Sequence, residues 1–156
     1  MTPLQMRDIF RARLAKTAND YKKRLDTLLD GYTSADAPHT APALLVERSV
    51  VIQILARQGT ALPLELPGRA QPGEVGLDAF ARSVRDKERS IVVWQLRDYM
   101  RWLGAALDGT SPHGLLDHAS STALVAERAQ VAQAISFFTT EPSVAVHQKP
   151  PEPPSL

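Results

Sequence analysis

The residues best suited to binding chemistry lie in 90–107, SIVVWQLRDYMRWLGAAL. At 100° per residue, Trp94, Arg97 and Arg101 share a narrow polar strip of a helix that is otherwise apolar. Trp and Arg dominate binding hot spots, and Arg97 is placed to stack on the Trp94 indole. We therefore predict that these three residues bind another protein. The alternative is structural, with both arginines covering a Trp that packs against a neighbouring helix.

A second set of charged residues could contact phosphates. Arg13, Lys16, Lys23 and Arg24 share one side of the first predicted helix, interrupted by Asp20. This set supports an alternative function, that of a nucleic-acid-binding accessory protein. The near-neutral net charge of +1 argues against it, and such a row is more typical of a solvated helix face.

Catalytic and metal-binding patterns are weak. His113, Asp117 and His118 are close in sequence, but a metal site needs three or four convergent ligands and no second cluster accompanies them. The chain has no phosphate-binding loop, nucleophile elbow, zinc-protease motif or dinucleotide fingerprint. Its carboxylates occur singly, whereas acid–base chemistry pairs them in an apolar pocket. We expect no metal, no cofactor and no catalytic residues; a small enzyme with a site assembled between helices is the third alternative.

The composition is that of a single globular domain. The chain has 156 residues, 44% hydrophobic and 22% charged. With no cysteine, it has neither disulfides nor thiol catalysis. The N-terminal residues lack the order of a signal peptide, and no apolar run reaches membrane-spanning length, so we expect a soluble cytoplasmic protein. No internal repeat is visible at a solenoid-like period.

The first predicted helix begins at Pro3, with Thr2 and Gln5 as a capping box, and runs to about Asp30, with Gly31 as its stop. Its apolar residues recur at alternating steps of four and three, a period that favours packing along another helix in the same chain or in a second copy. A homodimer through this helix is therefore one prediction. The seam consists of Leu14, Ala18, Tyr21, Leu25, Leu28 and Tyr32.

Two segments in the middle of the chain stay ambiguous. Residues 42–58 favour a helix between a Thr40 cap and a Gly59 stop, but the β-branched residues within 44–55 also suit a buried strand. Residues 59–76 are rich in Pro and Gly, and the leucines of 62–66 alternate at period two. This long segment is either a hinge or partner-binding arm, or a crossover whose leucines enter the core.

The second half predicts three more helices. The charged run 86–89 interrupts the apolar stripe, so a short helix from Leu77 should end near Arg89 and a buried central helix should follow. Ser120 or Ser121 should cap the last helix. We predict an all-α single domain over 1–140, a bundle of about five helices around 91–107, with a disordered Pro-rich tail at 141–156. The leading functional hypothesis is a non-enzymatic protein-interaction module: an adaptor, inhibitor or regulatory subunit.

Overall fold

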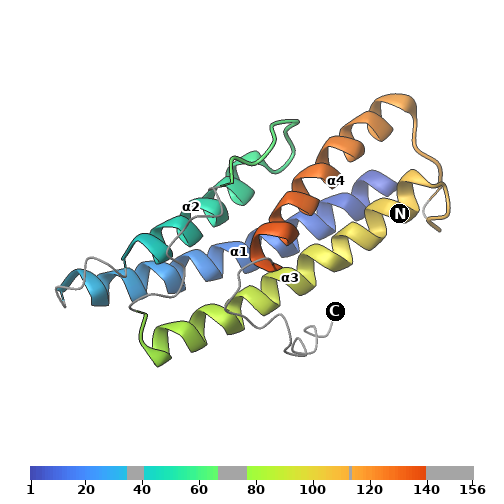
Figure 1. Cartoon of the computed structure of the whole chain (residues 1–156). Helices are drawn as coiled ribbons and strands as arrows, with labels where there is room; N and C mark the ends of the chain where they lie inside the picture. The colour runs from blue at the N-terminus through green and yellow to red at the C-terminus, as the bar shows by residue number, and fades with distance from the viewer. Residues whose placement is uncertain (35–40, 67–76, 113, 140–156) are drawn as a thin grey trace.

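The structure, a computed structural model, describes residues 1–34, 41–66, 77–112 and 114–139. Regular secondary structure in these residues consists of four helices: α1 (Pro3–Ser34), α2 (Ala41–Arg57), α3 (Ala79–Leu107) and α4 (His118–Thr139). The helices α1 and α3 cross the centre of the molecule, with α2 lying along α1 and α4 along α3 (Figure 1). The all-α class is confirmed, and 42–58 is helical except at its last residue. The predicted tail lies outside the described residues.

The first helix begins as predicted and ends later. The Thr2 N–H donates to Gln5 Oε1 at 2.8 Å, and the Gln5 N–H donates to Thr2 Oγ1 at 3.2 Å, which completes the capping box. The predicted stop at Gly31 is wrong, because α1 continues to Ser34. Positive φ angles that favour glycine occur instead at Gly59 and Gly109, at 83° and 74°, just beyond the ends of α2 and α3.

The apolar seam of α1 packs against other helices of the same chain. Its members from Leu14 to Leu28 are all buried in the core shared by the four helices. They are therefore occupied by intramolecular contacts, and this seam is not free to bind a second copy. A homodimer would have to use another surface.

The prediction of separate helices around residue 90 is wrong, because α3 is continuous over 29 residues. Its first turn is capped by Asp78, whose Oδ1 accepts the Ala81 N–H at 2.7 Å. The charged run does not break the stripe because Arg85 and Arg89 themselves occupy buried positions, 2% and 5% exposed. Within the described ranges the bundle thus has four helices rather than about five.

The start of α4 also differs from the prediction. The helix begins at His118, and Asp117 rather than Ser120 or Ser121 provides the cap, its Oδ1 accepting the Ser120 N–H at 2.7 Å. This hydrogen bond holds the pKa of the exposed Asp117 carboxyl below its usual value. Asp117 therefore serves helix initiation, while its neighbour His118 is exposed.

The four helices form two copies of one helical hairpin. Residues of α1 recur 78 positions later in α3, as with Arg11 and Arg89, and residues of α2 recur 80 positions later in α4, as with Glu47 and Glu127. The identical pairs are Arg7 and Arg85, Asp8 and Asp86, Arg11 and Arg89, Asp20 and Asp98, Tyr21 and Tyr99, Leu25 and Leu103, Leu29 and Leu107, Asp30 and Asp108, Gly31 and Gly109, Ala43 and Ala123, Leu44 and Leu124, Glu47 and Glu127, Arg48 and Arg128, Val51 and Val131, and Gln53 and Gln133.

Contacts between the hairpins show how they are related. Tyr21 and Glu47 of the first hairpin bind Arg89 of the second, and the equivalent residues of the second hairpin bind Arg11 of the first. Exchanging the two hairpins therefore maps these contacts onto one another, as an approximate two-fold rotation does. The repeat length is that of a whole hairpin, well beyond the solenoid-like periods that we considered in the sequence.

Candidate functional site

The structure brings part of the basic set next to α3, the helix that carries Trp94, Arg97 and Arg101. Lys23 and Arg24 of α1 line a groove of about 500 Å³ together with Glu88 and Ile91 of α3. Trp94 follows Ile91 by one helical turn, so it borders the same surface. We call this surface the α1–α3 face. Its groove is lined by Thr17, Asp20, Lys23, Arg24 and Thr27 of α1 and by Glu88 and Ile91 of α3. Helical spacing places Arg13 and Lys16 on the same side of α1 and Trp94, Asp98 and Arg101 beside Ile91 on α3, with Arg97 further round the helix.

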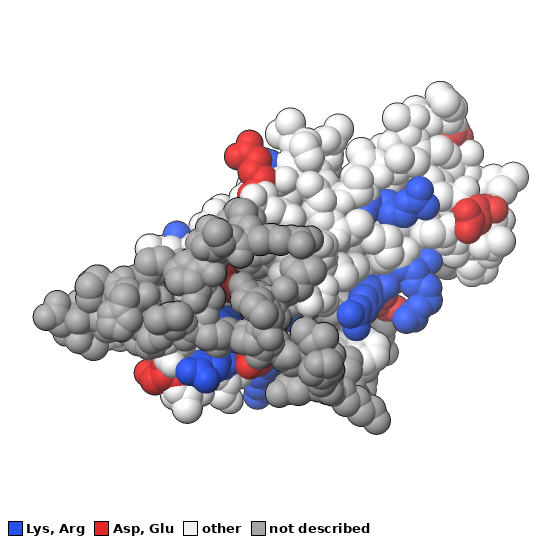
Figure 2. Space-filling view, viewed as in Figure 1, with Lys and Arg blue, Asp and Glu red and all other residues white. Residues whose placement is uncertain are grey.

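The basic side chains of the α1–α3 face differ in how far they are engaged. Lys16, Lys23 and Arg97 are exposed. The Arg24 side chain is 67% exposed, with its Nε 3.7 Å from Glu88 Oε1, and Arg101 bonds Asp98 over 3.4 Å. Such exposed pairs contribute little to stability, so these cations are available to a partner. Figure 2 shows basic side chains gathered beside acidic ones over α3.

Trp94 is the least exposed of the three predicted partner-binding residues. It is partly buried, and its indole Nε1–H has no acceptor among the residues that the structure describes. The expected stacking of Arg97 on the indole is not formed: among the described residues, the cation–π contacts belong to Arg89. Trp94 therefore supplies an apolar edge to the α1–α3 face, and the exposed arginines lie beside it independently.

A buried charged cluster, which the sequence analysis missed, joins α1, α2 and α3. The Tyr21 hydroxyl donates to Glu47 Oε1 at 2.6 Å, and Arg89 donates from Nε and Nη2 to the two Glu47 oxygens, both at 2.5 Å. Tyr21 and Glu47 are 0% and 1% exposed. The Arg89 guanidinium also lies about 6 Å from the rings of Phe137 and Phe138. We call Tyr21, Glu47 and Arg89 the sealed cluster.

Its counterpart in the repeat is more open. The Tyr99 hydroxyl donates to Glu127 Oε1 at 2.5 Å, and Arg11 donates from Nε and Nη2 to the two Glu127 oxygens at 2.6 and 2.7 Å. The Arg11 side chain is 22% exposed. Gly59 lies beside its guanidinium, where a Cβ would be 3.5 Å from Nη1. We call Tyr99, Glu127 and Arg11 the open cluster.

The environment favours neutral tyrosines and a charged arginine in these clusters. Burial raises the pKa of Tyr21 and Tyr99 well above the ordinary value, and their bonds to the neighbouring glutamates add to this. The hydrogen bond to Glu127 raises the pKa of Arg11. Both tyrosines therefore act as hydrogen-bond donors at neutral pH, and each carboxylate is bound by a cation and a hydroxyl at once.

Residues 60–66, which we call the strap, lie in a groove between α2 and α4. Leu64 donates its N–H to Gln133 Oε1 at 2.8 Å and accepts from Gln133 Nε2 at 3.2 Å. Glu65 makes the same pair of bonds with Gln53, at 2.6 and 2.8 Å. Leu64 is 5% exposed, whereas Leu62 is 59% exposed. The alternation expected for the leucines thus places Leu64 in the core and leaves Leu62 at the surface.

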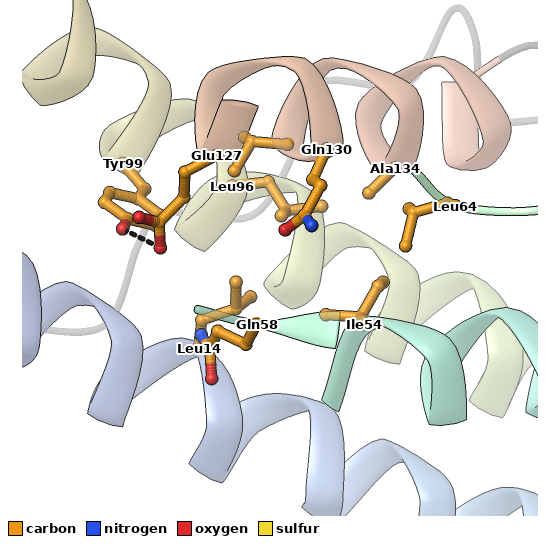
Figure 3. Close-up of a pocket in the computed structure, with 10 residues that line it drawn as sticks. Leu14, Ile54, Gln58, Leu64, Leu96, Tyr99, Glu127, Gln130 and Ala134 are labelled. Carbon is orange, nitrogen blue, oxygen red and sulfur yellow. Dashed lines mark hydrogen bonds between the residues drawn. The ribbon is translucent and has the colours of Figure 1, made fainter. Parts of the chain in front are cut away.

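A cavity of about 20 Å³ lies under the strap (Figure 3). Leu64 and Ile54 form apolar parts of its wall, and Glu127 reaches it together with Tyr99, its hydrogen-bond partner. The volume suffices for about one water molecule, so the cavity is too small for an organic substrate. The full lining is Leu14, Ile54, Gln58, Leu64, Leu96, Tyr99, Glu127, Gln130, Val131 and Ala134.

Two further searches covered the described part of the chain. No group of three or more His, Asp or Glu side chains converges there as metal ligands would, and His113 lies outside the described residues. None of the four helices is both long and apolar enough to cross a membrane. Comparisons with protein-family models, curated proteins and solved structures find no match for this chain.

Proposed function

We propose that this protein is a non-enzymatic protein-interaction module whose α1–α3 face binds an acidic surface of another protein. The observation that carries the proposal is that exposed Lys23 and Arg24 line one groove, with exposed Lys16 on the same side of α1. Exposed Arg97 and Arg101 lie on the helical strip of Trp94, which runs along α3 beside this groove. Rows of exposed cations attract acidic partners, and a neighbouring Trp adds apolar contact area. A role as an adaptor, inhibitor or regulatory subunit in the cytoplasm is the corresponding biological proposal.

The use of the interior groups also favours a binding role. The carboxylates of Glu47 and Glu127 are each engaged by an arginine and a tyrosine, and the cavity at Glu127 has room for about one water molecule. General acid–base catalysis needs a titratable group within reach of a substrate proton. These buried groups are instead bound to one another and position the helices.

The proposal is tested by capture from lysate of the cells that make the protein, comparing the wild type with the double variant Arg97→Glu/Arg101→Glu. Proteins lost with this variant are then purified, and their affinity for the wild type is measured by calorimetry. We expect a one-to-one complex that Trp94→Ala and the double variant weaken at least about ten-fold, as expected for hot-spot residues. Arg128→Glu, at an exposed position on α4, is the matched control and should bind like the wild type.

Nuclease treatment separates this proposal from its alternative. Capture that survives nuclease and depends on Arg97 and Arg101 supports a protein partner. Capture that disappears with nuclease, and that falls with Arg13→Glu but not with Arg97→Glu/Arg101→Glu, supports the nucleic-acid alternative and overturns the proposal. Circular dichroism of each variant confirms that helix content is unchanged, so that loss of binding is not loss of fold.

A further inference from the structure

The groove of the α1–α3 face has a counterpart at the opposite end of the contact between α1 and α3. There Phe10 stacks on Trp102 with ring centroids 5.5 Å apart, and both side chains are buried. We call this place the aromatic end. The approximate two-fold rotation carries Phe10 to the position of Glu88. It carries Trp102 to the position of Arg24, and both of these counterparts line the groove. The groove therefore lies where the repeat would place a second pair of stacked rings.

The space that the rings fill at the aromatic end stays open at the groove. The rotation gives the two ends a similar separation of α1 and α3, but the Arg24 side chain is 67% exposed, with its Nε 3.7 Å from Glu88 Oε1. An exposed arginine fills less of the gap between two helices than a buried tryptophan does. The open volume is about 500 Å³, which exceeds the volume of an aromatic side chain. A ring of another protein therefore fits in the groove.

The lining of the groove offers an aromatic ring both apolar and cationic contacts. Ile91, which is partly buried, forms the apolar part of the wall, and Thr17 and Thr27 add uncharged side chains. The aliphatic stem of Arg24 is also apolar, and its guanidinium can lie over the face of a ring as a cation–π partner. These contacts suit an aromatic side chain better than a purely aliphatic one.

The charges beside the groove favour a carboxylate next to the ring. Lys16, Lys23 and Arg24 are exposed on this side of α1, with the exposed Asp20 among them. The Glu88 side chain is 14% exposed and already lies near Arg24. The exposed cations thus outweigh the exposed acid and attract a negatively charged segment. Lys23 lines the groove itself, so it is placed to bind such a carboxylate.

We propose that the groove of the α1–α3 face takes up one aromatic side chain of the partner protein, from a segment that carries a carboxylate beside the ring. The ring lies against Ile91 and the stem of Arg24, and the carboxylate binds Lys23. This inference rests on the proposed function, since it states the chemistry with which the partner meets the α1–α3 face. Aromatic anchors that fill a pocket at the centre of an interface are typical hot spots.

The first part of the test uses phenylpropionate, a small molecule with one ring and one carboxylate. It is added to the full-length wild-type protein, and amide chemical shifts are followed by NMR. We expect saturable shifts at Thr17, Lys23 and Ile91, with a Kd on the order of 1–10 mM, which is usual for a fragment of this size. Propionate, which lacks the ring, should give no saturable shifts. Phenylpropanamide, which lacks the charge, should bind about three-fold more weakly.

The second part uses a groove-filling variant, Arg24→Trp/Glu88→Phe, which installs the residues of the aromatic end. It should abolish the shifts caused by phenylpropionate and weaken binding of the captured partner at least about ten-fold. If this variant disturbs the helices, Lys23→Glu decides, because it changes an exposed residue and repels the carboxylate. Lys23→Glu should weaken both ligands at least about three-fold. Arg128→Glu, with the same change of charge on α4, is the matched control and should bind both like the wild type.

Shifts that persist in the groove-filling variant, or equal binding of phenylpropionate and phenylpropanamide, overturn the inference. A partner that binds the groove-filling variant like the wild type also overturns it. If Arg97→Glu/Arg101→Glu still weakens that partner, the proposed function itself stands. Failure to capture any partner contradicts the proposed function instead, and the shifts with phenylpropionate then decide whether the groove accepts a ring beside a carboxylate.

Discussion

The sealed and open clusters contain the same three residue types in the same bonding pattern, yet they differ in access to water. Arg89 is 5% exposed and lies beside two phenylalanine rings, whereas the Arg11 side chain is 22% exposed and lies beside Gly59. A buried charge needs its ion-pair partner far more than a solvated charge does, because water cannot replace the partner. The comparison teaches that stability can depend strongly on one copy of a repeated ion-pair motif, the sealed cluster, and only weakly on the other copy, the open cluster.

The two ends of the α1–α3 contact also differ in access to water. Phe10 stacks on Trp102 with ring centroids 5.5 Å apart, and the counterparts of these two residues are Glu88 and Arg24, a loose ion pair. The aromatic pair fills one end of the contact, while the charged pair borders the open groove. The approximate two-fold symmetry thus identifies the groove as the place where the repeat departs from core packing.

The largest expected loss of stability follows from removing the carboxylate charge of the sealed cluster. Glu47→Gln leaves the Arg89 cation buried without its carboxylate, so we expect the free energy of unfolding to fall by about 3–5 kcal/mol. Glu127→Gln in the open cluster should lower it by only about 1–2 kcal/mol, because water reaches Arg11. Urea denaturation measures both. Equal losses in the two variants would show that exposure of the arginine does not distinguish the clusters.

The next largest loss of stability should follow from a substitution at the aromatic end of the α1–α3 contact. Trp102 is 8% exposed and stacks on both Phe10 and Tyr99, so Trp102→Ala removes a large buried side chain and should lower stability by about 3–4 kcal/mol. Thermal unfolding followed by circular dichroism measures the change. A loss below about 1 kcal/mol would mean that Trp102 is not packed as described.

High pH should destabilise the fold through both tyrosines. Their pKa values are raised by burial from the usual 10.0, so above pH 10 the unfolded chain releases protons that the folded chain retains. Stability is therefore complete below pH 10 and falls above it, by about 1.4 kcal/mol per pH unit for each tyrosine. Tyr21→Phe and Tyr99→Phe should each flatten this dependence in urea titrations between pH 9 and 11. Lysines titrate equally in all variants, so an unchanged slope would contradict the raised pKa values.

The smallest effect is expected at the open groove. Arg24→Ala removes an exposed side chain and a 3.7 Å ion pair, so stability should change by no more than about 0.5 kcal/mol. The same urea experiment that measures Glu47→Gln checks this value. A loss comparable to that of Trp102→Ala would show that the groove is part of the core after all.

Local signals in the sequence predicted much of this fold. Thr2 and Gln5 form the predicted cap because capping depends on residues three apart. The seam of α1 is buried because its apolar period is local to the helix. The α1–α3 face follows from the same helical spacing, although the sequence did not place Trp94 and Lys23 on one surface.

The parts that could not be predicted depend on partners far away in sequence. Arg89 looks like a solvated residue of a charged run until Glu47, on another helix, is known to face it. The same holds for Arg11 and Glu127, separated by 116 positions. The repeat itself could have been detected in the sequence. An alignment of Arg11 and Tyr21 with Arg89 and Tyr99 would have identified these residues and the equivalent glutamates.

The most direct test of the difference between the clusters is a pair of double-mutant cycles, one with Glu47→Gln and Arg89→Met, the other with Glu127→Gln and Arg11→Met. Each cycle isolates the coupling free energy of one glutamate–arginine pair from other effects of the substitutions. We predict a coupling of about 2–3 kcal/mol in the sealed cluster and no more than about 1 kcal/mol in the open cluster. Equal couplings, or a stronger one between Arg11 and Glu127, would contradict the account.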